Sequence, residues 1–75
     1  MGGHGNLAGM RRGAVATVKS LGGHPELRAR LQELGFVPGS EVRLVAAAAF
    51  GGALAFQVRG STVALRRSDA ATILV

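Results

Sequence analysis

Cysteine, tryptophan and tyrosine are absent from this 75-residue chain, and acidic residues are few. Without cysteine there is no disulfide framework, no thiolate zinc site and no thiol nucleophile. With three phenylalanines as its only large aromatic residues, the chain has few platforms on which nucleic-acid bases could stack. Nine basic residues against four acidic ones leave a formal charge of +5. The chain is therefore basic, and its length allows one domain only.

Long apolar runs are also missing. The main apolar stretch, residues 44–56, is interrupted by Gly51 and Gly52 and is shorter than the roughly 20 residues of a membrane-spanning helix. The N-terminus has no apolar run of the secretory type. We therefore expect no membrane span and a cytoplasmic location. Residues 1–9, which include four glycines, are expected to be a flexible arm before a single domain over residues 10–75.

Alternating apolar and polar residues predict five short strands. These strands cover residues 14–21, 41–48, 54–59, 62–66 and 73–75. Their inward residues are expected to be Ala16, Val18, Val42, Leu44, Phe56, Val58, Val63 and Leu65. Turn chemistry separates the strands: Pro38-Gly39 is typical of a type II turn, Phe50-Gly51-Gly52 of a hairpin tip and Gly60-Ser61 of a further turn.

A helix is predicted after the first strand. Pro25 suits a first helical turn, and Leu27, Leu31 and Leu34 recur at helical spacing. This leucine stripe is expected to pack onto the sheet. Gly35 is expected to end this helix in a Schellman motif. Near the C-terminus, Ser68 is expected to cap a short helical turn. The fold class is therefore mainly β: a small five-stranded antiparallel barrel with one inserted helix and a short C-terminal helical turn.

No catalytic constellation is visible in the sequence. His4 lies in the expected arm and His24 beside a glycine pair, so neither is held as a triad histidine must be. The four acidic residues are expected to face solvent, with no pair placed to share a site: Glu26, Glu33, Glu41 and Asp69. We therefore expect a protein that is not an enzyme and has no evident cofactor.

Two binding alternatives remain open. If Met1 is removed, Gly2-Gly3-His4 offers a square-planar nitrogen set suited to Cu(II) or Ni(II), although a chance occurrence in a glycine-rich segment is the favoured interpretation. The arginine doublets and the outward Arg43 and Arg59 also suit a small basic barrel that binds nucleic acid. The doublets are Arg11-Arg12 and Arg66-Arg67.

Two segments resemble the signature blocks of the FeoA family. Residues 30–42, RLQELGFVPGSEV, resemble R-L-x-x-L-G-x-x-P-G-x-x-V. Residues 58–70, VRGSTVALRRSDA, resemble the second block, V-R-G-x-x-x-A-L-R followed by an alanine. The resemblance extends over residues 7–75, and two linked blocks in order are more specific than either alone. It implies an SH3-like β-barrel with an inserted helix.

The resemblance also implies a function. FeoA proteins are bacterial accessory proteins of ferrous iron transport, so we expect a cytoplasmic, non-enzymatic protein that binds and regulates FeoB, the membrane transporter with a GTPase domain. We expect Phe50, Arg59 and Arg66 to form part of this partner surface, with the two arginines projecting from adjacent strands onto one patch, against the simpler interpretation of a solvated strand face. Weak transition-metal binding is associated with the family, which leaves a metal-responsive module that forms homo-oligomers as a further alternative.

Overall fold

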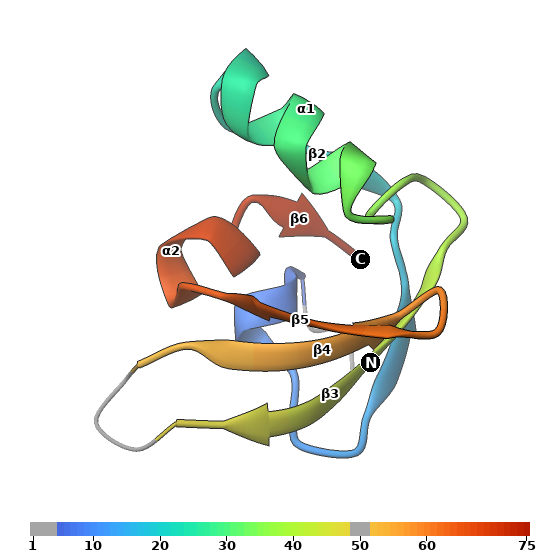
Figure 1. Cartoon of the computed structure of the whole chain (residues 1–75), viewed down its shortest axis with the longest axis vertical. Helices are drawn as coiled ribbons and strands as arrows, with labels where there is room; N and C mark the ends of the chain where they lie inside the picture. The colour runs from blue at the N-terminus through green and yellow to red at the C-terminus, as the bar shows by residue number, and fades with distance from the viewer. Residues whose placement is uncertain (1–4, 49–51) are drawn as a thin grey trace.

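The described residues form two antiparallel sheets (Figure 1). The computed structural model describes residues 5–48 and 52–75. The main sheet has the strand order β1-β3-β4-β5, and a smaller sheet pairs β2 with β6. In chain order, the elements are the 3-10 helix η1 (Leu7–Gly9), β1 (Val15–Thr17), β2 (Ser20–Leu21), α1 (Pro25–Glu33), β3 (Glu41–Ala47), β4 (Leu54–Val58), β5 (Ser61–Leu65), α2 (Arg67–Ala70) and β6 (Ile73–Leu74).

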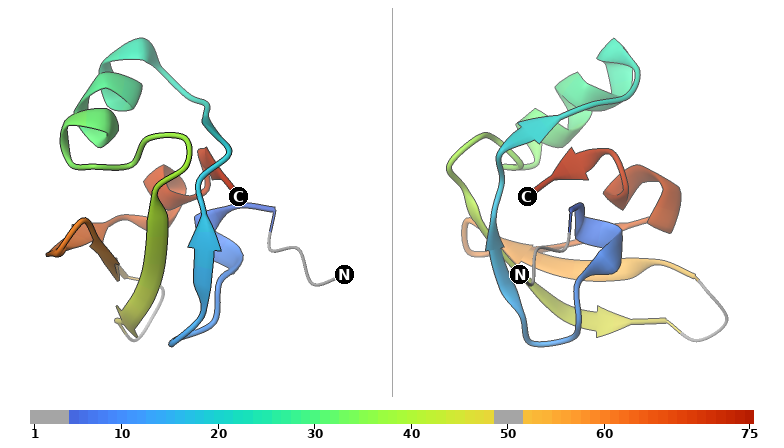
Figure 2. Two further views of the ribbon diagram at one scale, coloured as in Figure 1. Left: turned by 90° about the vertical axis from the view of Figure 1, so that its right-hand side faces the viewer. Right: turned by 180° about the vertical axis from the view of Figure 1, so that it is seen from behind.

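The first predicted strand divides between the two sheets. β1 pairs with β3, whereas β2 pairs with β6. Between them, the Val18 N–H donates to the Ser40 carbonyl at 2.9 Å, and the Val18 carbonyl accepts from the Gly39 N–H at 2.8 Å. The chain thus passes from one sheet to the other without losing its hydrogen bonds. Five predicted strands become six, because one continuous segment serves both sheets (Figure 2).

The end of helix α1 is a Schellman motif, as the sequence predicts. The Phe36 N–H donates to the Leu31 carbonyl and the Gly35 N–H to the Gln32 carbonyl, both at 3.0 Å. Gly35 has φ +111°, a conformation that favours glycine. The leucine stripe is less buried than predicted. Leu31 is fully buried, but Leu34, which occupies the C-cap, is 39% exposed.

Two other predicted turns can be compared with the structure. The Ser40 N–H donates to the Val37 carbonyl at 2.9 Å and Gly39 has φ +93°, which confirms the type II turn at Pro38-Gly39. The turn after β4 lies one residue earlier than predicted, at Arg59-Gly60, because Val58 pairs directly with Ser61. The predicted hairpin tip at Phe50-Gly51-Gly52 falls largely outside the described residues.

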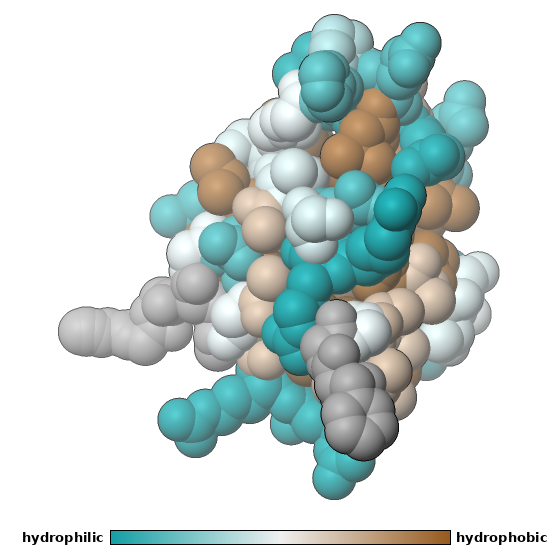
Figure 3. Space-filling view, turned by 90° about the vertical axis from the view of Figure 1, so that its left-hand side faces the viewer, coloured by the Kyte–Doolittle hydropathy of each residue, from teal (hydrophilic) through white to brown (hydrophobic). Residues whose placement is uncertain are grey.

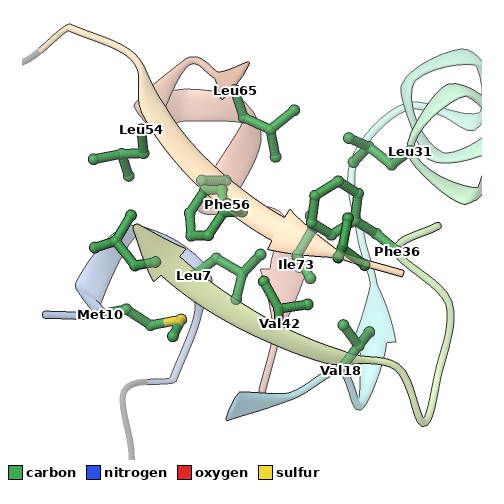
Figure 4. Close-up of a cluster of buried hydrophobic side chains, with 13 residues drawn as sticks. Leu7, Met10, Val18, Leu31, Phe36, Val42, Leu54, Phe56, Leu65 and Ile73 are labelled. Carbon is green, nitrogen blue, oxygen red and sulfur yellow. The ribbon is translucent and has the colours of Figure 1, made fainter. Parts of the chain in front are cut away.

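The hydrophobic core lies against the inner face of the main sheet (Figure 4). The rings of Phe36 and Phe56 meet edge to face, with centroids 6.3 Å apart and an angle of 89° between their planes. The predicted inward residues Val42, Leu44, Phe56, Val58 and Leu65 are all buried. Their burial confirms the alternation predicted for the strands.

The N-terminal segment differs from the expected arm. Residues 5–9 belong to the fold, whereas residues 1–4 lie outside the described part. Leu7, in η1, is fully buried in the core, and the Asn6 Oδ1 accepts a hydrogen bond from the Ala8 N–H at 2.9 Å. Asn6 also forms a bridge with Leu74. The buried Leu7, the Asn6 cap and the bridge to Leu74 together hold this glycine-rich segment against the fold.

The short helical turn near the C-terminus is present as α2, but its cap is not the predicted one. Arg66 is the N-cap residue and makes no side-chain capping bond, so Ser68 lies inside the helix. β5 ends at Leu65, so Arg66 is not part of a strand. Within the described residues, no helix is long and apolar enough to cross a bilayer.

Candidate functional site

A shallow, open depression of about 260 Å³ lies on the outer face of the main sheet. Its lining combines charged, amide, apolar and glycine residues: Val15, Glu41, Arg43, Gln57, Arg59 and Gly60. Strand register brings most of them together, because Val15 pairs with Arg43 and Arg43 with Gln57. Successive strands are about 5 Å apart, so these three side chains form one row across three strands.

The charges of this depression are not neutralised by ion pairs within it. Arg43 and Arg59 face a single carboxylate, that of Glu41. In the part of the chain that the structure describes, the one ion pair is Arg66 Nε to Asp69 Oδ2, at 3.7 Å. The two guanidinium groups of the depression are thus available to a ligand. Their surroundings suit an anion better than a cation.

Arg59 occupies a strained turn position. It is the only non-glycine residue with positive φ in the described part of the chain, at +52°, and Gly60 follows at +81°. Two consecutive positive φ values between paired Val58 and Ser61 are what a type I′ hairpin turn requires. The Arg59 stem lies against Gly35, since a Cβ on that glycine would come within 2.9 Å of the Arg59 Cδ.

Arg66 lies at the other end of β5. Its side chain is 80% exposed, and it reaches Asp69 in the first turn of α2. Five residues of β5 separate it from the β4–β5 turn, a distance of about 17 Å along the strand. The prediction that Arg59 and Arg66 project from adjacent strands onto one patch is therefore wrong. Each remains a separate predicted contact with a partner.

Phe50, the third predicted contact, lies outside the described residues. The sequence pattern placed Arg43 on an outward face, which the structure confirms. It gave no sign that Val15 and Gln57 would flank this arginine. Their outward alternation was visible, but which outward residues become neighbours depends on the pairing of strands far apart in the sequence.

Over residues 5–48 and 52–75, no three histidine, aspartate or glutamate side chains gather as ligands of one ion. His24 is the N-cap of α1 and is exposed. His4 lies outside the described part of the chain. The face shown in Figure 3 carries hydrophilic side chains at the α1 end and at the opposite end, with separate apolar patches between them.

These features define a class of protein: a small SH3-like β domain with an apolar interior and an open polar depression on its outer sheet face. The FeoA domain model matches residues 5–75. The chain belongs to the FeoA family. The fold predicted from its sequence, mainly β with an inserted helix, is confirmed.

Solved structures agree with this assignment. The FeoA protein of Stenotrophomonas maltophilia was solved with zinc, as an SH3-domain protein put forward as an activating factor of ferrous iron transport. It is 36% identical, with a TM-score of 0.82, and the match covers 93% of this chain and 87% of that one. For the FeoA protein of Chlorobium tepidum the identity is 29% and the TM-score 0.85, with 91% of this chain covered. This chain spans 65% of the Chlorobium protein, just under two thirds of its length.

A regulator also shares the fold. A manganese-dependent transcriptional repressor is 25% identical with a TM-score of 0.84, and the match covers 93% of this chain but 39% of the repressor. The domain thus also occurs as one part of a larger protein. A search of curated proteins by sequence gave no match.

Proposed function

We propose that this chain is a non-enzymatic accessory protein of bacterial ferrous iron uptake, which binds the FeoB transporter at the cytoplasmic face of the membrane and regulates it. The observation that carries this proposal is the FeoA match over residues 5–75. The Stenotrophomonas protein, put forward as a transport activating factor, supports the same role.

The distribution of polar groups supports a surface-acting protein. The core of the described residues contains no buried polar or charged residue, and it is filled by leucine, valine, phenylalanine, isoleucine, methionine and alanine side chains. Charged and amide groups converge instead in the outer-face depression around Arg43. This distribution supports a protein that acts through contacts on its outside, as an adaptor does.

Co-purification tests the choice of partner. Full-length FeoB from the same genome, solubilised in detergent and tagged, is expected to retain this chain, and the complex should weaken as salt is raised because the chain is basic. Arg59→Ala and Arg66→Ala should each lower retention while leaving the folded state intact. Absence of retention, with GDP and with a non-hydrolysable GTP analogue alike, would contradict the proposal.

The proposal assigns the chain no cofactor. Copper or nickel binding by Gly2-Gly3-His4 remains a prediction about residues outside the described part. Titration with Cu(II), on chains with and without Met1, tests it through the absorption band of an amine- and amide-bound copper ion.

A metal-bridged homo-oligomer is tested separately, by sedimentation with and without Zn(II). An unchanged sedimentation coefficient would exclude it.

A further inference from the structure

We propose that the outer-face depression binds a carboxylate-bearing segment of a partner protein, with Arg43 as the central contact. This inference rests on the proposed function in that the ligand is a protein, and it adds the chemistry by which that protein is recognised. The lining residues, their register and their charges carry it.

Arg43 stands between two different neighbours. Val15, 43% exposed, lies on the β1 side of it, and Gln57 lies on the β4 side. A guanidinium presents a planar fork of donors that fits a carboxylate through two parallel hydrogen bonds. The Gln57 amide adds a further donor, and Val15 offers apolar surface to the methylene groups of an aspartate or glutamate side chain. The row therefore suits both parts of an acidic side chain, its methylene groups and its carboxylate.

The charge balance limits the ligand further. Arg43 and Arg59 supply two positive charges to the depression, and Glu41 supplies one negative charge. A single carboxylate brings this set to neutrality. A phosphate group, with about −1.5 to −2 charges, would exceed it and would lie close to Glu41. The Glu41 carboxylate can instead accept a hydrogen bond from a backbone N–H of the bound segment.

The position of the aromatic residues favours a protein ligand over a nucleic acid. None of the described residues that line the depression is aromatic, and Phe36 and Phe56 are fully buried in the core. Single-stranded nucleic acids gain much of their affinity from stacking on exposed rings. An acidic peptide needs no such platform.

An NMR titration of the full ¹⁵N-labelled chain tests the site. The probe is a capped hexapeptide of alternating leucine and glutamate, and its counterpart has glutamine in place of glutamate. The glutamate peptide is expected to shift the amides of Val15, Arg43 and Gln57, and the glutamine peptide to shift them much less. Arg43→Ala should weaken binding of the glutamate peptide by about five- to tenfold, as loss of a charge-assisted contact does.

Two matched variants sharpen this test. Arg67→Ala removes the same charge from α2, away from the depression, and should change the affinity by less than about twofold. Glu41→Gln removes the like charge beside the ligand and should strengthen binding by about twofold or more. If Arg67→Ala weakens binding as much as Arg43→Ala does, the attraction is a property of the whole basic surface and the site is overturned.

Other outcomes also overturn the site. Shifts centred on Thr62 and Ala64 would mean that the peptide adds as a strand to the edge of β5. Inorganic phosphate that competes with the glutamate peptide at lower concentration than acetate would indicate a phosphate site. The peptide experiment does not involve FeoB. If FeoB does not retain the chain but the peptide binds, the proposed function alone is contradicted. If FeoB retains the chain but the peptide does not bind, this site alone is contradicted.

Discussion

The two faces of the main sheet use the same strands for different purposes. On the inner face, Val42, Phe56 and Val58 are at most 1% exposed. On the outer face, Glu41, Arg43 and Gln57, the residues next to them in sequence, are exposed and line the depression. Core residues and residues that line the depression thus alternate along β3 and β4. Substitutions on the inner face should alter unfolding, and those on the outer face should alter binding.

The largest expected effect is on the inner face, at Phe56. Phe56→Ala removes a fully buried ring and its edge-to-face contact with Phe36, and should lower the free energy of unfolding by about 3–5 kcal/mol. Urea denaturation followed by circular dichroism measures this change. Gln57→Ala, one residue further on, is the matched control. Equal losses for the two variants would contradict the division between the faces.

If Phe56→Ala does not fold at all, Phe56→Leu keeps the comparison measurable. Leucine retains most of the apolar volume, so a loss of about 1–2 kcal/mol is expected. Gln57→Ala should still remain within about 0.5 kcal/mol of the unsubstituted chain.

The second effect concerns Gly35, which lies against the side chains of Arg59 and Val58. Gly35→Ala forces alanine into φ +111° and places its Cβ 2.9 Å from the Arg59 Cδ. Backbone strain at such a position costs about 1–3 kcal/mol, and the close contact should add about 1 kcal/mol. Gly39→Ala is the control, because its φ is +93° but nothing lies within 4 Å of the added Cβ.

A double variant separates the two contributions at Gly35. In an Arg59→Ala background the close contact is gone, so Gly35→Ala should cost no more than Gly39→Ala does. Unfolding measurements on the original chain, Gly35→Ala, Arg59→Ala and the double variant complete this cycle. A Gly35→Ala penalty unaffected by Arg59→Ala would show that the arginine stem yields without cost.

The third effect is at Arg59 itself. Its φ of +52° is poorly tolerated by β-branched residues, so Arg59→Val should destabilise the fold by about 1–2 kcal/mol. Arg59→Asn removes the same charge but suits the first position of a type I′ turn, and should stay within about 0.5 kcal/mol of the original. Thermal unfolding distinguishes the two variants. Equal stabilities would mean that the turn relaxes to another conformation.

The smallest effect on stability is expected at Arg43. Arg43→Ala should change the free energy of unfolding by less than about 0.5 kcal/mol, because the side chain is exposed and has no ion pair among the described residues. The same variant should lower binding of the acidic peptide, as set out above. A large loss of stability would show that Arg43 is a structural residue and would remove the contrast between the faces.

Local features of this fold were predictable from the sequence. Gly35 ends α1 as expected, since the two hydrogen bonds of a Schellman motif join residues within one short segment. The Pro38-Gly39 turn was predictable for the same reason. Features that depend on distant partners were missed. Leu34 was expected inside because its spacing is helical, but it is exposed at the C-cap of α1, and Phe36, two residues on, is fully buried.

The candidate site shows the same limit. Arg59 was expected on a strand, because its neighbours alternate, and it lies instead in the turn that the Val58–Ser61 pairing closes. Arg66 was expected beside it and lies at the far end of β5. The N-terminal segment was expected to be an arm because it is rich in glycine. Glycine content does not show whether a single leucine finds a place in the core, as Leu7 does.

The sequence by itself determined which residues of each strand face inward and where the chain turns, since alternation and turn conformation are properties of neighbouring residues. Only the tertiary structure decided that Val15, Arg43 and Gln57 stand in one row and that Leu7 fills the core. Those contacts join residues far apart in the chain. Their formation depends on the register of whole strands, which no local pattern encodes.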